Sequence, residues 1–223
     1  MSDKVRVCID KVPQDSYKEI AAINQYLWEP GQSIHVRFME GIPEVQEKVK
    51  KYAKKWEEYA NIKFEFGNNP DAEIRISFDE NDGSWSLIGT NCKEVDKDKA
   101  TMNYGWLKPD TPDTEYSRVV LHEFGHALGC IHEHQNPTAE IPWDKEAVYR
   151  YYMGPPNNWT KEQVDNNLFT RYSKEITSFT EFDPTSIMLY SIPNEHTIGD
   201  FEVVGGVILT EKDKEFIQKL YPH

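Results

Sequence analysis

The chain contains little cysteine, no long apolar run and no excess of basic residues. Its 223 residues include three cysteines, Cys8, Cys92 and Cys130, and this low, odd number excludes a disulfide framework while leaving one bridge possible. No stretch approaches the roughly 18 apolar residues of a membrane-spanning helix, so we expect no membrane partner. The formal net charge of −13 argues against a nucleic-acid partner, because a protein that neutralises phosphates needs a basic surface.

The amino-terminal residues MSDKVRVCID have no apolar run after their charges, so no secretory signal is visible. This pattern leaves a cytoplasmic location and export by a non-classical or dedicated route both open. Hydrophobic residues make up 38% of the chain and aromatic residues 13%, which is enough for a folded core. We expect a monomer with one domain over residues 1–223, divided into an N-terminal lobe of about 1–129 and a C-terminal lobe of about 130–223.

Two long helices are predicted in the N-terminal lobe, before Gly129. Between Pro43 and Tyr59, apolar residues recur at intervals of three and four, which is the period of an amphipathic helix. The second long helix has Thr111 as its expected N-cap and Pro112 in its first turn, and it ends at Gly129. A capping box of Ser16 and Glu19 predicts a shorter helix over residues 16–27.

Strand patterns surround the first long helix and follow it. Residues 33–40, 62–68 and 72–79 alternate between apolar and polar side chains, with a turn predicted at 67–70, and 84–90 and 100–106 are shorter candidates. After Gly129 the chain is irregular, with short helices predicted near 143–152 and after Thr160, and a last helix from Thr210 that buries Phe216 and Leu220. The predicted fold class is therefore α+β, with a mixed twisted sheet.

The segment HEFGHALGCIH, which begins at His122, contains the residues of a zinc site. His122 and His126 are four residues apart, so they lie one above the other on a helix, about 6 Å apart along its axis. Two imidazoles at this separation can both bind one zinc ion at about 2.0–2.1 Å. Glu123 lies about 100° further around the helix, where it can take a proton from a zinc-bound water.

His132 can join the same metal only if the helix ends before it. In a continuous helix it would lie about 15 Å along the axis from His122. Gly129 allows the reversal, because glycine adopts a left-handed backbone conformation without steric cost. Three histidines and a water molecule form a catalytic zinc site, whereas a structural site has four protein ligands. The expected cofactor is one Zn²⁺ ion.

This motif resembles the signature of the metzincin metallopeptidases, and Glu133 together with SIMLY (186–190) is similar to the astacin branch. The resemblance implies a two-lobed metzincin fold, with two long helices in the N-terminal lobe and an irregular C-terminal lobe that ends in a helix. It further implies that Met188 forms the methionine turn beneath the zinc. Tyr190 would be a further metal ligand that swings to stabilise the transition-state oxyanion. The implied activity is that of a zinc endopeptidase acting on protein or peptide substrates.

The same resemblance indicates where substrate would bind and where this chain departs from the family. Trp85, Ser86 and Leu87 belong to a segment similar to the edge strand that pairs with extended substrate, and Ser84 occupies a position where that strand usually has cysteine. In the family, the glutamate at the position of Glu133 engages the processed amino terminus, and no cleavage site is visible here. The pattern is closer to a disulfide-poor microbial relative than to an animal enzyme.

Two alternative functions remain open at this point, and the sequence does not separate a general peptidase from a toxin or effector that cleaves one host protein. One is a zinc hydrolase that acts on small amides, and a second is a non-catalytic zinc-binding module with the same fold. The presence of Glu123 argues against the second, because a binding module has no need of a carboxylate beside its metal. A third hypothesis concerns regulation: the Cys8 thiolate could cap the zinc and keep the enzyme latent.

Overall fold

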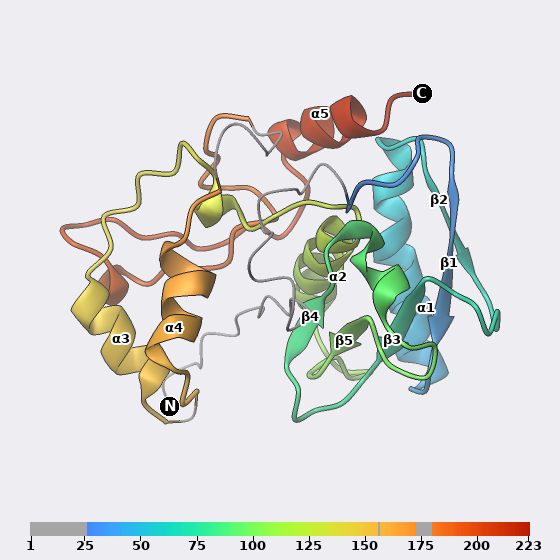
Figure 1. The fold of residues 1–223 in the computed structure, drawn as a ribbon, viewed down its shortest axis with the longest axis horizontal. Helices are drawn as coiled ribbons and strands as arrows, with labels where there is room; N and C mark the ends of the chain where they lie inside the picture. Colours follow the sequence, from blue (N-terminus) through green and yellow to red (C-terminus); the bar gives the residue numbers. More distant parts are fainter. Residues whose placement is uncertain (1–25, 156, 173–179) are drawn as a thin grey trace.

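The computed structural model describes residues 26–155, 157–172 and 180–223. Cys8 and all but the last two residues of the helix predicted at 16–27 lie outside these ranges. The described chain forms a five-stranded sheet with two long helices, followed by a half with shorter helices and few regular strands (Figure 1). The predicted α+β fold class is confirmed.

The sheet is mixed, as predicted. Its strands are β1 (Ser33–Phe38), β2 (Lys63–Phe66), β3 (Ile74–Ser77), β4 (Ser84–Ser86) and β5 (Met102–Tyr104). They lie in the order β2-β1-β3-β5-β4, in which β4 alone runs antiparallel to its neighbour and forms one edge. Residues 67–70 therefore connect two strands that do not pair with each other, because β1 lies between them.

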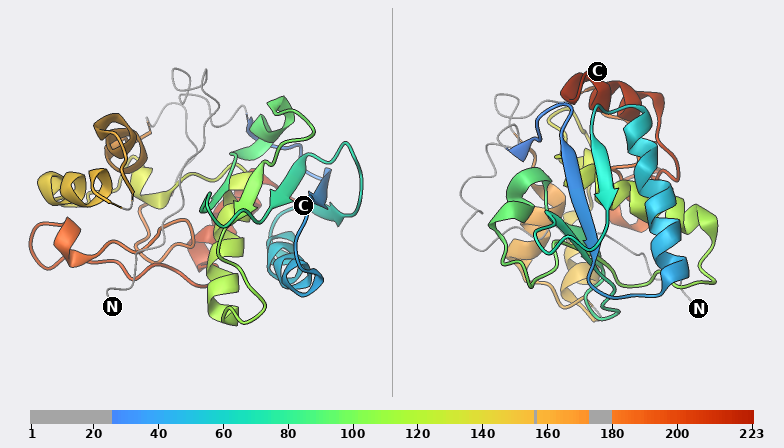
Figure 2. Two further views of the ribbon diagram at one scale, coloured as in Figure 1. Left: turned by 90° about the horizontal axis from the view of Figure 1, so that it is seen from below. Right: turned by 90° about the vertical axis from the view of Figure 1, so that its right-hand side faces the viewer.

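The two long helices cover one face of the sheet (Figure 2). Helix α1 (Pro43–Ala53) continues as a 3-10 turn (Lys54–Glu58), so the predicted helix over 43–59 is tighter in its last part. Helix α2 (Asp113–Ala127) begins one residue later than the sequence indicates, with Pro112 as its N-cap. The hydroxyl group of Thr111, the expected cap, instead accepts a hydrogen bond from the backbone N–H of Lys108, at 2.9 Å.

The second half contains α3 (Lys145–Met153), α4 (Lys161–Val164) and α5 (Glu211–Leu220). The helices predicted after Thr160 and from Thr210 are both present, and each begins with a capping box. The buried face of α5 differs from the prediction, because Ile217 and Tyr221 are fully buried while Phe216 and Leu220 are only partly so. None of the described helices is long and apolar enough to span a bilayer.

Two hydrophobic clusters form the core of the described chain. The larger cluster lies between the sheet and helices α1 and α2, and the smaller one packs around α3 and α4. Ile187 and Met188 belong to the first cluster, and Leu189 and Tyr190 belong to the second. The segment 187–190 therefore joins the two cores, and it does so directly beside the histidine motif.

Arg75 breaks the alternation of residues 72–79, since its charged side chain is completely buried. Its guanidinium donates hydrogen bonds to backbone carbonyl oxygens only, those of Ala72, Glu73, Cys92, Val95, Asp96 and Lys99. A buried cation is tolerated only when its donors are satisfied. Arg75 thereby fixes the segment 92–99, which connects the edge strand β4 to β5.

Candidate zinc site

Helix α2 carries His122 and His126 and ends before His132, so that the third histidine can turn back toward the first two. The last helical residue is Ala127, and Gly129 follows with a φ of +92°. An L-residue is strained in this conformation, and a Cβ atom at position 129 would also lie 2.6 Å from Cδ2 of Leu27. The chain reverses here and brings His132 beside His122 and His126.

The imidazoles converge through their Nε2 atoms. Nε2 of His126 lies 3.2 Å from Nε2 of His122 and 3.3 Å from Nε2 of His132. Nδ1 of His122 lies 2.7 Å from the carbonyl oxygen of Ile187, and Nδ1 of His126 lies 2.9 Å from that of Cys130. A carbonyl oxygen can only accept, so both Nδ1 atoms carry protons and both Nε2 atoms present lone pairs.

This arrangement fits a zinc ion. Burial and the neighbouring imidazoles lower the pKa of His122 well below its usual value, which keeps it neutral. Lone pairs that face one another at 3.2 Å repel unless a cation lies between them. Tetrahedral nitrogen ligands at 2.0–2.1 Å from zinc are roughly 3.3–3.4 Å apart, close to the separations found here. The three buried histidines are thus suited to hold the metal.

Glu123 follows His122 on α2 and is completely buried. It lies about 100° around the helix from His122. A carboxylate in this position does not lie on the helical face that carries His122 and His126, so it is poorly placed as a further zinc ligand. It is nevertheless adjacent to His122 in the sequence and therefore close to the metal site. Its placement suits proton transfer at the site better than structural binding of zinc.

Met188 lies directly beneath the motif. A Cβ atom on Gly125, the helical residue just before His126, would lie only 2.3 Å from the sulfur of Met188. The backbone carbonyl of Met188 accepts a hydrogen bond of 3.0 Å from the N–H of Glu133, the residue after the third histidine. The turn at Met188 therefore contacts the motif on both sides of the chain reversal.

Tyr190 lies beside the third histidine, with its ring centroid 5.5 Å from that of His132. Its hydroxyl oxygen is 3.4 Å from Nε2 of His134, and that nitrogen is 2.7 Å from the carbonyl oxygen of Asn167. Because His134 must donate to the Asn167 carbonyl, it cannot accept the phenol proton through the same atom. The side chain of His134, which the zinc motif does not include, thus lies behind Tyr190.

The side chains of Trp85, Ser86 and Leu87 are buried, so only their backbone is suited to bind a peptide at the edge. Trp85 packs in the larger core, and its indole N–H donates to a carboxylate oxygen of Asp82 at 2.9 Å. The N–H of Leu87 donates to the carbonyl of Thr101 at 3.0 Å. Because strand residues alternate, the backbone N–H and C=O of Ser86 point away from β5.

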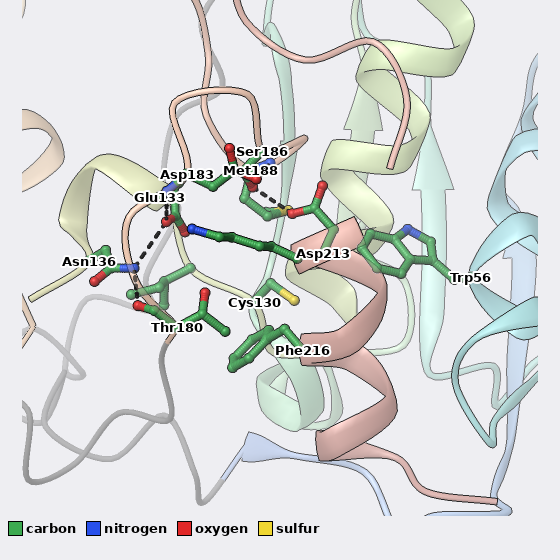
Figure 3. Close-up of a pocket in the computed structure, with 12 residues that line it drawn as sticks. Trp56, Cys130, Glu133, Asn136, Thr180, Asp183, Ser186, Met188, Asp213 and Phe216 are labelled. Carbon is green, nitrogen blue, oxygen red and sulfur yellow. Dashed lines mark hydrogen bonds between the residues drawn. The ribbon is translucent and has the colours of Figure 1, made fainter. Parts of the chain in front are cut away.

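A cavity of about 40 Å³ adjoins the site on the side of α5 (Figure 3). Glu133 lies in its wall and accepts hydrogen bonds from the amide of Asn136 and the backbone N–H of Asp183, at 3.0 and 2.9 Å. Burial raises the pKa of Glu133 to about 7, and these two donors oppose the shift. Asp213 and Phe216 of α5 form the opposite wall.

The two described cysteines, Cys92 and Cys130, are buried free thiols, so no bridge joins them. Burial raises the pKa of Cys92 to about 12, which keeps that thiol protonated and unreactive. Cys8, the proposed cap on the zinc, lies outside the described residues.

The family model of the Astacin peptidases matches residues 21–204. The chain belongs to the astacin family. A solved structure of myroilysin is 46% identical in sequence and superposes with a TM-score of 0.88, covering 91% of this chain and 98% of that one. High choriolytic enzyme 1, a hatching enzyme zinc-protease from the medaka fish Oryzias latipes, shares the fold at 17% identity, with a TM-score of 0.63 over 89% of this chain and 95% of that chain.

A further relative is longer than this chain. Zinc metalloproteinase nas-38 of Caenorhabditis elegans is 25% identical over 165 residues, which cover 73% of this chain and 20% of the worm protein. The chain thus spans about a fifth of that relative's length. Family membership confirms the predicted astacin-like zinc metalloendopeptidase class and its single zinc cofactor.

Proposed function

We propose that this astacin cleaves internal peptide bonds, with Glu123 as the base and Tyr190 as the group that stabilises the oxyanion. The observation that carries the proposal is the convergence of three imidazoles beside a buried carboxylate on the same helix as two of them. When bound to His122, His126 and His132, zinc supplies Lewis acidity that polarises the scissile carbonyl and makes water reactive at neutral pH.

Glu123 moves the proton. It accepts a proton from the attacking water and then delivers it to the nitrogen of the leaving amine. Complete burial of Glu123 favours this role, since the proton then passes between two groups in a site shielded from bulk water.

Tyr190 stabilises the charge that develops on the carbonyl oxygen. Its ring lies against that of the zinc-binding His132, and a phenol is a hydrogen-bond donor that suits an oxyanion. A hydrogen bond aimed at an oxyanion in a low-dielectric site contributes a factor of about 10²–10³ to the turnover number. A role of Tyr190 as a further zinc ligand before substrate binds belongs to the same proposal.

The backbone of Ser86 binds the substrate. Its N–H and C=O point away from β5, so an extended peptide can add to β4 through main-chain hydrogen bonds. The buried side chains of Trp85 and Leu87 support the strand, so these two residues would contribute to substrate binding by holding its backbone in place.

A single chain suffices for the site, and we propose that the enzyme acts as a monomer without nucleic-acid or membrane partners. All candidate residues come from one chain, and the net charge of −13 disfavours association with phosphate groups. Specific activity that stays constant over a wide range of enzyme concentrations would support the monomer.

The decisive test compares the wild type with Glu123→Gln. We expect one zinc ion per chain in both proteins and a turnover number at least about 100-fold lower in the variant, which is the usual contribution of general acid–base catalysis. Zinc content is measured by atomic absorption, and cleavage is followed on a proteome-derived peptide library. Equal cleavage by both proteins would remove Glu123 from the mechanism.

A further inference from the structure

Asp213, in the first turn of α5, contacts the methionine turn through both carboxylate oxygens. Oδ1 accepts a hydrogen bond from the hydroxyl of Ser186 at 2.6 Å, and Oδ2 accepts one from the backbone N–H of Ile187 at 3.0 Å. The Asp213 side chain is buried and also caps its own helix by accepting from the N–H of Thr210. Figure 3 shows Asp213 beside Ser186 and Met188.

A continuous series of hydrogen bonds connects this carboxylate to a zinc ligand. Nδ1–H of His122 donates to the carbonyl of Ile187 at 2.7 Å. The N–H of the same peptide unit, that of Met188, donates to Oγ of Ser186 at 3.0 Å. The Ser186 hydroxyl then donates to Asp213, so every donor in the series points toward the carboxylate.

The direction of these bonds matters for the metal. Hydrogen bonds that all point the same way polarise one another, most strongly when the last acceptor carries a charge. A carboxylate that accepts directly from a metal-binding histidine fixes its tautomer and makes the other nitrogen more basic. Here a peptide unit and a serine hydroxyl lie between the two groups, and the same polarisation is transmitted through them.

We propose that Asp213 and Ser186 are positioning residues for the zinc ligand His122. They hold its Nδ1 proton on Ile187 and increase the affinity of its Nε2 atom for zinc. Through them, the helix nearest the carboxyl end of the described chain controls the metal affinity of the helix at its centre.

Three variants separate this role from a purely structural one. Ser186→Ala interrupts the series, and Asp213→Asn removes its charge while keeping the shape of the side chain. Thr210→Ala is the matched control. It removes the hydroxyl that accepts a hydrogen bond of 3.1 Å from the backbone N–H of Asp213, and it leaves the hydrogen bonds between Asp213 and His122 intact. The zinc dissociation constant of each is measured by competition with a chelator, on protein shown by urea titration to be folded without metal.

We expect Ser186→Ala and Asp213→Asn each to raise the zinc dissociation constant about 10- to 100-fold, the range found for partners of metal-binding histidines. The zinc dissociation constant of the double variant should exceed the larger of the two single-variant values by no more than about threefold. The reason is that both residues act through one series of hydrogen bonds. Thr210→Ala should stay within about threefold of the wild type.

Two results would overturn the proposal. One is wild-type zinc affinity in Asp213→Asn and Ser186→Ala, or an equal loss in Thr210→Ala. The other is a double variant whose two losses multiply, since this would show that the residues act independently. Zinc affinity is measured without substrate, so the outcome does not depend on whether Glu123 and Tyr190 have the proposed catalytic roles.

Discussion

Gly125 lies between the zinc-binding histidines of α2 and leaves no room for a side chain. A Cβ atom there would lie 2.3 Å from the sulfur of Met188 and 3.3 Å from Cζ2 of Trp56. Alanine normally stabilises a helix relative to glycine by about 0.5–1 kcal/mol. We expect the opposite for Gly125→Ala, a loss of about 1–3 kcal/mol in the free energy of unfolding, as in other overpacked cores. Urea denaturation measures it, and a stabilised variant would contradict the packing of Met188 beneath the motif.

His196 makes the stability of the second half dependent on pH. Its ring is buried against Tyr151, at a centroid distance of 4.7 Å, and its Nε2 atom has no hydrogen-bond partner among the described residues. Burial lowers the pKa of His196, with a smaller opposing effect from Glu195. The unfolded chain therefore takes up this proton first as the pH falls, so the contribution to stability is complete above about pH 6.5 and is lost below it.

The variant His196→Phe keeps the aromatic packing without the titrating nitrogen. We expect the wild type to lose up to about 1.4 kcal/mol per pH unit relative to this variant as the pH falls below about 6.5. Urea titrations of both proteins from about pH 8 to about pH 5 provide the comparison. Since the two proteins share every other titratable group, parallel stability curves would show that His196 does not contribute.

At this scale, the sequence predicts which imidazoles meet but not what holds them. The spacing of His122 and His126 and the glycine at 129 are both visible in the sequence. The acceptors of the Nδ1 protons are the backbone carbonyls of Ile187 and Cys130. Every residue has a backbone carbonyl, so the residue types do not reveal which ones act as acceptors. Asp213 is visible in the sequence only as a capping residue, because its contact with Ser186 depends on the tertiary fold.

Strand β4 is the element that we propose binds substrate, and two proline variants test this proposal. Ser86→Pro removes an N–H that points away from β5, and proline is tolerated on edge strands in this orientation. We expect the KM for peptides to rise about 5- to 10-fold, as for the loss of one hydrogen bond of about 1–1.5 kcal/mol, with little change in unfolding free energy. Steady-state kinetics and urea denaturation measure the two effects.

Leu87→Pro is the matched control, because it removes the N–H that donates to Thr101. This variant should lose about 1–3 kcal/mol of unfolding free energy, since it leaves the carbonyl of the buried Thr101 without its donor. If Ser86→Pro leaves the KM for peptides unchanged, substrate does not pair with this edge.

The elements themselves were largely predictable, and their arrangement was not. Alternation identified β1, β2 and β3, yet it could not place β2 and β3 on opposite sides of β1, because strand order is set by contacts distant in sequence. The boundaries shifted where a local signal was ambiguous, as at Thr111 and Pro112. The burial of Arg75 could not be predicted either. All its hydrogen-bond acceptors are backbone oxygens, which lie just before β3 or in the segment 92–99, and no residue type marks them in the sequence.

At the scale of the whole molecule, we expect bound zinc to stabilise the folded state where the two hydrophobic clusters meet. The histidines come from α2 and the loop after it, and the segment 187–190 beside them joins the two hydrophobic clusters. A ligand that binds only the folded state stabilises it by about 4 kcal/mol when present at about a thousandfold excess over its dissociation constant. We expect removal of zinc by a chelator to lower the urea midpoint accordingly.

Two variants control for effects of the chelator itself. Glu123→Gln should show the same shift as the wild type, because it retains all three histidines. His126→Ala should show none, because it lacks one of them. A urea midpoint of the wild type that does not respond to zinc would contradict the stabilising role of the metal.

The hydroxyl of Tyr221 donates to the carbonyl of Leu128 at the end of α2, and the carbonyl of Tyr221 accepts from the N–H of Asn61 beside the sheet. A chain growing on the ribosome folds from its amino end, so the turn that aligns the histidines lacks this brace until almost the whole of the described chain has been made. The turn that aligns the histidines is thus supported by a residue near the carboxyl end of the described chain, and it gains this support only after α5 has docked against α2.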